Sequence, residues 1–294
     1  MERFAPIFVV FGAVSYAMVG IILEVATYHG YPVQKIIVGM YLLSFIVLHM
    51  LYCVSKKTNA SLSRKEFLLF LSLGIFTISI TYCFYHSLRF VGVPIATLLL
   101  MQSSWITPLL SACLRKTSLA KKDIISMCFI VFGVFLSAYS HDVTISFAGI
   151  GWGLAAALSY SIMLLCSSNL AKEKSVLEKS SAISLGAFLI SLVLFHNDSH
   201  VDFLSERTYW SLLYALFATI LPLTLLATGL KYISANLAGA LIALEVPAAY
   251  ILSAVFLADQ ITNNQILGCL IITLTIGLPK VYEVILNRKK KPNI

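Results

Sequence analysis

The stretch FAPIFVVFGAVSYAMVGIILEVAT, residues 4–27, decides the fold class of this chain. Glu24 is its only charged residue. A helix needs about 20 apolar residues to cross the ~30 Å hydrocarbon core of a bilayer, so the stretch is predicted to be a transmembrane helix. It is longer than the apolar core of a signal peptide and follows no strongly basic leader, so we expect it to be retained.

Runs of the same kind recur almost to the end of the chain. Hydrophobic residues make up 59% of the sequence and charged residues 12%, whereas a soluble protein carries about 25% charged residues. In lipid, backbone groups must be satisfied within their own segment, so these runs predict helices and an all-α, multi-pass membrane protein. We expect ten spans, of which the seventh is the weakest: 4–27, 33–54, 67–88, 93–113, 122–140, 147–168, 180–196, 208–229, 237–257 and 263–285.

Basic residues gather in alternate gaps between these spans. The formal charge of +8 is therefore not a nucleic-acid signal, because its placement follows the positive-inside rule. That pattern predicts that both termini are cytoplasmic, and the basic tail is expected to contact lipid headgroups. The basic gaps hold these residues: Lys56, Lys57, Arg64 and Lys65; Arg115, Lys116, Lys121 and Lys122; Lys172, Lys174 and Lys179; and the tail Arg288 to Lys291.

The cysteines predict neither disulfides nor a metal site. All six are scattered one to a span, without a CxxC pair, and are interpreted as small apolar side chains within helices. We expect no metal and no cofactor. The six are Cys53, Cys83, Cys113, Cys128, Cys166 and Cys269.

The two halves of the sequence resemble each other. One constant displacement in residue number brings Leu88-Arg89-Phe90 onto Leu230-Lys231-Tyr232, and a slightly longer one brings Ser15-Tyr16 onto Ser159-Tyr160. This predicts two units of five spans, residues 1–141 and 142–294. An odd number of spans in each unit gives them opposite orientations in the membrane, an inverted repeat that is common in secondary transporters.

The second unit carries the more specific motifs: Leu244-Glu245-Val246-Pro247, then Val255-Phe256-Leu257-Ala258-Asp259, then Gln265-Ile266-Leu267-Gly268. They resemble the EamA domain of the drug/metabolite transporter superfamily. Members typically carry Gly-Glu where this chain has Ala258-Asp259, and in the first unit Trp105 stands where Pro247 stands in the second. The resemblance implies a carrier of small metabolites, such as amino acids, nucleotide sugars or cationic drugs, without naming the cargo.

Glu245 is the leading candidate for a functional residue. It lies near the middle of the ninth predicted span, and Ala249 and Ser253 share its helix face. A carboxylate at that depth either binds a cationic group or a proton, or it bonds a neighbouring helix. Pro247 is expected to loosen the helix just beyond it.

Three further groups of polar residues are candidates for the pathway. Gln102, Ser103 and Trp105 are expected at the level of Glu245, where Trp105 either stacks on substrate or packs between helices. Tyr82 and His86 belong to a polar stripe that either lines the pathway or bonds adjacent helices, and His86 is a candidate proton partner. Tyr16 and Tyr160 form a symmetric pair that lines the cavity or packs.

Glu24 is a second ionisable candidate. It either snorkels to the membrane interface or makes a gate contact, for example with Lys35 across the short loop.

The sequence lacks the motifs of the common hydrolases, zinc peptidases, kinases and nucleotide-binding enzymes. We therefore do not expect this chain to be an enzyme. The leading prediction is a secondary active transporter that moves a small polar metabolite, such as an amino acid or an organic cation, across a bacterial inner membrane. Transport would be driven by protons or by exchange. A flippase for a lipid-linked substrate is the alternative, followed by a non-transporting receptor or an intramembrane enzyme.

The expected partners are the substrate and membrane lipids, not nucleic acid, and the chain is expected to be a monomer or a homodimer.

Overall fold

The computed structural model describes residues 4–55, 61–116, 121–138, 146–170, 174–196, 206–229, 232–233, 237 and 241–289. The boundary between the two predicted units, at residues 141 and 142, lies outside these residues. So do Leu230 and Lys231 of the repeat pattern and several members of the basic gaps: Lys56, Lys57, Lys172, Lys290 and Lys291.

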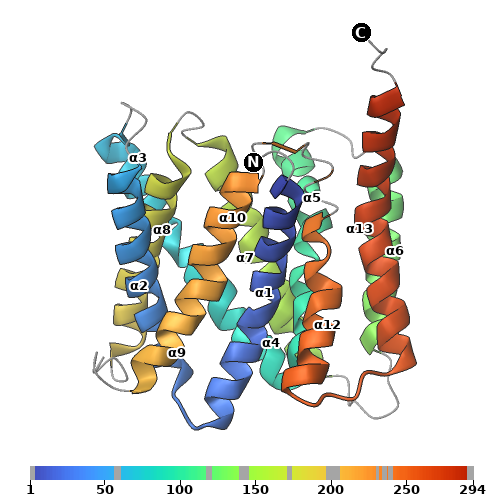
Figure 1. The fold of residues 1–294 in the computed structure, drawn as a ribbon, viewed down its shortest axis with the longest axis horizontal. Coiled ribbons are helices and arrows are strands. Elements are labelled where there is room, and N and C mark those ends of the chain that lie inside the picture. Colours follow the sequence, from blue (N-terminus) through green and yellow to red (C-terminus); the bar gives the residue numbers. More distant parts are fainter. Residues whose placement is uncertain are drawn as a thin grey trace.

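Within this described part every regular element is a helix, as Figure 1 shows. The helices are α1 (Ala5–Tyr28), α2 (Val33–Val54), α3 (Arg64–Ser72), α4 (Gly74–Leu100), α5 (Ser103–Arg115), α6 (Lys121–Ala138), α7 (Phe147–Asn169), α8 (Val176–Leu194), α9 (Glu206–Ala215), α10 (Leu221–Gly229), α12 (Glu245–Phe256) and α13 (Asn263–Lys289). A π-helical segment, Leu216–Ile220, joins α9 to α10.

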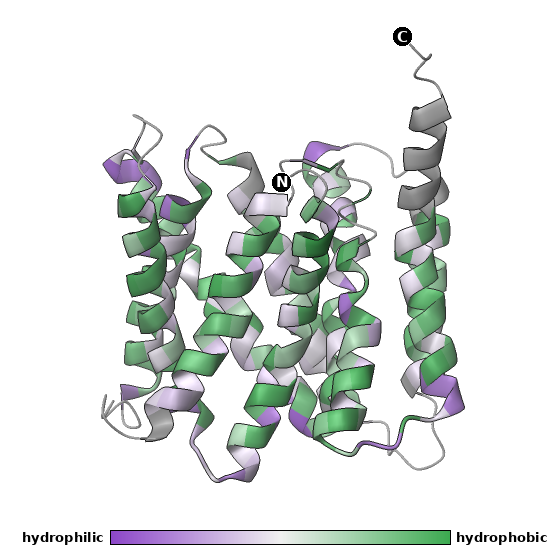
Figure 2. Cartoon of the chain, in the orientation of Figure 1, coloured by the Kyte–Doolittle hydropathy of each residue, from purple (hydrophilic) through white to green (hydrophobic). Residues whose placement is uncertain are grey.

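Among the described residues, six helical segments are long and apolar enough to cross a bilayer. They are Ala5–Tyr28, Val33–Val54, Arg64–Leu100, Phe147–Ser167, Val176–Leu194 and Thr208–Leu226. Shorter apolar helices occupy Ile124–Ser137, Glu245–Phe256 and Asn263–Leu278. Hydrophobic residues predominate along the helices (Figure 2), and many large apolar side chains are exposed. The chain is therefore a multi-pass membrane protein, while the number of ten spans stays a prediction.

The link expected between the third and fourth predicted spans is a break in the helical backbone. Helix α4 is interrupted at Gly92, whose φ of 77° and ψ of 165° are not helical. Glycine tolerates this conformation because it has no Cβ, and Pro94 lacks the N–H that a regular helix would use there. Helix α4 therefore consists of two helical segments that meet at Gly92.

Helix starts and backbone conformations recur in the second half of the chain. The difference in residue number is the same as that between Leu88 and Leu230. The first residues of four helix pairs are all related by it: α1 and α7, α3 and α9, α5 and α12, and α6 and α13. The same displacement relates Lys116 to Ala258, the two described non-glycine residues with positive φ, at 52° and 55°. The two halves are therefore structural copies in local detail as well as in hydropathy.

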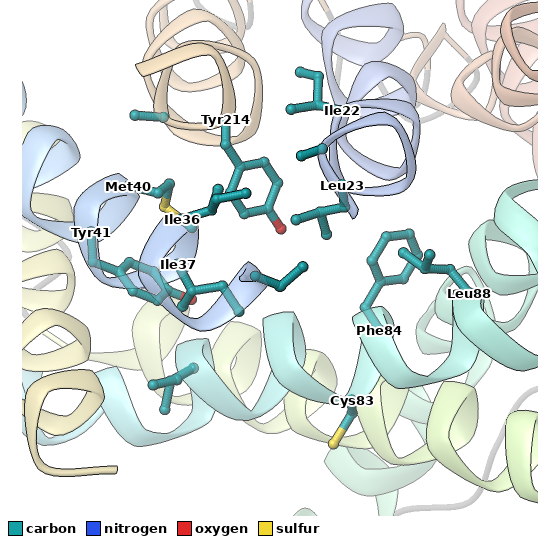
Figure 3. Packing of buried hydrophobic residues seen from close by; sticks show 14 of the residues in the cluster. Ile22, Leu23, Ile36, Ile37, Met40, Tyr41, Cys83, Phe84, Leu88 and Tyr214 are labelled. Atoms are coloured by element: carbon teal, nitrogen blue, oxygen red, sulfur yellow. The ribbon is translucent and has the colours of Figure 1, made fainter. Parts of the chain in front are cut away.

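Large apolar side chains from α1, α2, α4 and α9 form the main core (Figure 3). Its labelled members include Leu23, Ile36, Phe84 and Tyr214. Helix α12 packs against α1 and α4, and α6 packs along α13 (Figure 1). Consequently α1 and α4, from the first repeat, hold the helix of the second repeat that carries Glu245.

Candidate functional site

Glu245 is the first residue of α12 and is 7% exposed. The turn that contains it is wound more tightly than an α-helix, because Val246 N–H donates to the Ala243 carbonyl at 3.4 Å, three residues back. Pro247 explains this turn, since its ring excludes a regular helix through the carbonyl of Ala243, four residues earlier. Pro247 was expected to loosen the helix just beyond Glu245, whereas the irregular turn includes Glu245 itself.

Two tyrosines from other helices lie near this carboxylate. The hydroxyls of Tyr16 on α1 and Tyr160 on α7 are close enough to Glu245 for its negative charge to oppose their ionisation. Among the described residues no hydrogen bond reaches the Glu245 carboxylate. The structure therefore places Tyr16 and Tyr160 near Glu245, with which they were expected to line one pathway.

The face of α12 beyond Glu245 is covered by protein. Ala249 and Ser253 are both fully buried. The Ser253 hydroxyl donates to the carboxylate of Asp259, which follows the left-handed residue Ala258. Ser253 therefore anchors the loop that leads into α13.

Gln102 and Trp105 bond to each other at the start of α5. The Trp105 indole N–H donates to the Gln102 Oε1 at 2.9 Å, and the Gln102 Nε2 donates to the Leu98 carbonyl at 3.0 Å. Gln102 and Ser103 are buried. Leu98 belongs to the same apolar cluster as Val246 and Tyr250, so this end of α5 does lie near the start of α12.

Tyr82 and His86 join an aromatic cluster between α4, α7 and the end of α8. The His86 ring stacks on Trp152 with centroids 5.0 Å apart, and Tyr82 meets His86 edge-on at 4.4 Å. Phe195 lies 6.1 Å from Tyr82. Trp152 and Phe195 were not predicted as site residues. Glycines flank Trp152 in the sequence, and because they suit close helix contact they were the available signal.

Glu24 lies near charges that the sequence analysis did not connect with it. Its carboxylate lies within electrostatic range of the Arg89 guanidinium, which favours its charge, and of the Asp259 carboxylate, which opposes it. One oxygen, Oε2, is buried without a hydrogen-bond partner among the described residues. A gate contact between Glu24 and Lys35 stays a prediction, and Arg89 is a second candidate partner.

Metal binding finds no support in the described side chains, where no three His, Cys, Asp or Glu residues come together. All six cysteines are free, and Cys53, Cys113 and Cys128 are exposed on the outer surface of the helices.

Comparison with known proteins gives a family and a fold. The EamA-like transporter family model matches residues 3–139 and again residues 147–278. A solved structure, "Crystal structure of protein", shares the fold with a TM-score of 0.67 at 11% identity, over 99% of this chain and 100% of that chain. The sequence matches no curated protein. Because the family model matches twice and covers nearly the whole length, this chain belongs to the EamA-like transporter family.

Proposed function

We propose that this chain is a secondary active transporter for a small metabolite that carries a cationic or zwitterionic group, such as an amino acid or an organic cation. The observation that carries the proposal is the buried Glu245 carboxylate, which has the hydroxyls of Tyr16 and Tyr160 from two other helices near it. These three helices belong to both repeats, so a ligand held there would contact both halves of the molecule.

The charge of the site supports a cationic occupant. A buried carboxylate that no described residue hydrogen-bonds is costly in an apolar environment. A substrate ammonium group or a proton would neutralise it, and the two tyrosines would add hydroxyl groups and aromatic faces that favour cations. Alternation between substrate and proton at one carboxylate would couple transport to a proton gradient. Alternation between two substrates would produce exchange.

Access to this site requires helices to move, because Glu245 is only 7% exposed. Alternating access would follow if the two repeats are inverted five-span units that exchange conformations. In this proposal the chain has ten spans with both termini cytoplasmic in a bacterial inner membrane, and works as a monomer or a homodimer. The beginning of α1 and the end of α13 lie at the same end of the bundle, which supports an even number of spans (Figure 1).

The test is ligand-dependent thermal stability of the purified full-length protein. The panel covers amino acids, polyamines, nucleosides, nucleotide sugars and quaternary amines. A ligand that binds the folded state raises the Tm by mass action, so a saturable shift identifies the cargo class. Proteoliposomes are then tested for uptake of that compound.

Glu245→Gln is expected to abolish the Tm shift and the uptake while the Tm without ligand stays at or above the wild-type value. A hydrogen bond to a charged group contributes about 1.5–3 kcal/mol, so affinity should fall about 10- to 100-fold. Glu178→Gln is the matched control, because Glu178 lies on α8 and bonds the backbone N–H of Leu62 at 2.9 Å. Wild-type shifts in Glu245→Gln would refute the site. If wild-type protein responds to no water-soluble class, a lipid-linked substrate becomes the better proposal.

A further inference from the structure

Each repeat has a tightened turn at an equivalent place, at the start of α5 in the first repeat and at the start of α12 in the second. In the first repeat, Gln102 N–H donates to the Leu99 carbonyl at 3.1 Å and Ser104 N–H donates to the Met101 carbonyl at 3.0 Å. In the second, Leu244 N–H bonds Leu241 and Val246 N–H bonds Ala243 with the same three-residue spacing. Short segments of this kind within a helix often mark a hinge.

Side chains hold the first of these turns. Because Gln102 N–H bonds Leu99, the carbonyl of Leu98 has lost its usual helical donor, and the Gln102 Nε2 takes that place at 3.0 Å. The Trp105 indole holds the other end of the amide at 2.9 Å. Gln102 is 2% exposed, so water does not compete for these bonds.

The Leu98 carbonyl therefore has two alternative donors on the same residue. In the tightened turn it accepts from the Gln102 side chain, and in a regular α-helix it would accept from the Gln102 backbone N–H. Each arrangement satisfies the carbonyl with one hydrogen bond. Because the carbonyl is satisfied in both arrangements, the turn can act as a two-state element.

The second turn lacks this choice. The displacement that relates the two repeats places Pro247 at the position of Trp105, and Leu244 at the position of Gln102. A proline has no N–H and its ring excludes the preceding α-helical turn, so the break is built into the covalent structure. An apolar Leu244 offers no side-chain donor to a carbonyl.

We infer that the two turns differ in function. The turn of the first repeat, held by the hydrogen bonds of the Gln102 side chain, can convert to a regular α-helix, whereas Pro247 keeps the turn of the second repeat tightened. The rearrangement that opens the Glu245 site is then centred on residues 98–105. This inference rests on the proposed transport function. Gln102 and Trp105 are positioning residues, which control the direction of α5 from within the helix.

The experiment measures distances by double electron–electron resonance in nanodiscs, without any substrate. Spin labels at Leu114→Cys on α5 and Leu158→Cys on α7 report the first-repeat turn. Labels at Phe256→Cys on α12 and Phe11→Cys on α1 report the second. All four side chains are exposed. The exposed native cysteines, Cys53, Cys113 and Cys128, are first replaced by serine.

Gln102→Leu is expected to change the distance distribution of the α5–α7 pair and leave the α12–α1 pair unchanged. Losing one net hydrogen bond should lower the population of the tightened conformer about 2- to 10-fold relative to the regular one. Trp105→Phe keeps an aromatic ring and removes the N–H, so it should shift the distribution the same way by less. This second variant tests the role of these hydrogen bonds even if Gln102→Leu folds poorly.

Thr107→Val is the matched control, because the Thr107 hydroxyl on α5 is buried without a hydrogen-bond partner among the described residues. It should leave both distributions unchanged. A wild-type α5–α7 distribution in Gln102→Leu and Trp105→Phe, or an equal change in both pairs, would overturn the inference. The distance measurement uses no substrate, so a ligand screen without hits does not affect it. Conversely, unchanged distances would refute the inference about the turn but not the proposal that Glu245 binds substrate.

Discussion

Ala258 occupies a backbone conformation that glycine would adopt at less cost. Its φ is 55°, directly after α12 ends, in the left-handed region where a Cβ approaches the following carbonyl. That crowding costs an L-residue about 1–2 kcal/mol. Replacing Ala258 by glycine removes this cost, but gives the unfolded chain more freedom, worth about 0.4–1 kcal/mol in the opposite direction. Ala258→Gly is therefore expected to stabilise the protein by about 0.5–1 kcal/mol.

The matched control is the same substitution four residues earlier. Ala254 is exposed within α12, where a glycine has no conformational advantage and costs about 0.5–1 kcal/mol. The two variants should consequently differ by about 1–2 kcal/mol with opposite signs. Both side chains are exposed, so neither change creates a cavity in the core.

The assay is thermal unfolding of the two variants and the wild type, side by side in one detergent. For a chain of this size, 1 kcal/mol shifts the Tm by roughly 2–4 °C at most. Ala258→Gly should melt above the wild type and Ala254→Gly below it. A Tm for Ala258→Gly at or below the wild-type value would show that the left-handed turn stores no relievable strain, and would refute the reasoning.

Further predictions concern the packing of glycines and the capping of a helix. Each is a change in the free energy of unfolding, measured by equilibrium or thermal unfolding. Gly151→Ala should stabilise by about 0.5–1 kcal/mol, because no neighbour lies within 4 Å of the added methyl group. Gly153→Ala, two residues along the same helix, should destabilise by about 1–3 kcal/mol because its Cβ would come within 2.7 Å of Leu99. Equal effects of these two changes would contradict the packing of α7 on α4. Ser63→Ala removes a capping box at the start of α3 and should cost about 0.5–2 kcal/mol, whereas unchanged stability would show that this cap contributes nothing.

Family and repeat could both be predicted from the sequence. Hydropathy depends on composition along the chain, so the apolar runs were sufficient to predict a membrane protein of helices. The motif around Glu245 and Pro247 was sufficient to predict the EamA-like family, which the family match confirms. The displacement between the repeats, predicted from a few residue pairs, recurs in the starts of four helix pairs.

Some helix boundaries could not be predicted from the sequence. Helices α5 and α12 are short, because each begins at a tightened turn within an expected span. Such turns depend on which donor reaches a carbonyl, as at Leu98, and hydropathy does not record hydrogen bonding. Pro247 was noticed, but its effect falls on the turn that contains Glu245.

The residue pattern alone was enough to predict a membrane environment, the family and the duplication, because these follow from local composition and spacing. Which side chains meet depends on the tertiary fold. Tyr16, Tyr160 and Glu245 are far apart in the sequence and converge because α12 packs on α1 and α4. Likewise, Glu24 comes within electrostatic range of Arg89 and Asp259, which are distant in the sequence. Contacts between helices depend on the relative placement and rotation of each helix, which the residue pattern along a single helix does not specify.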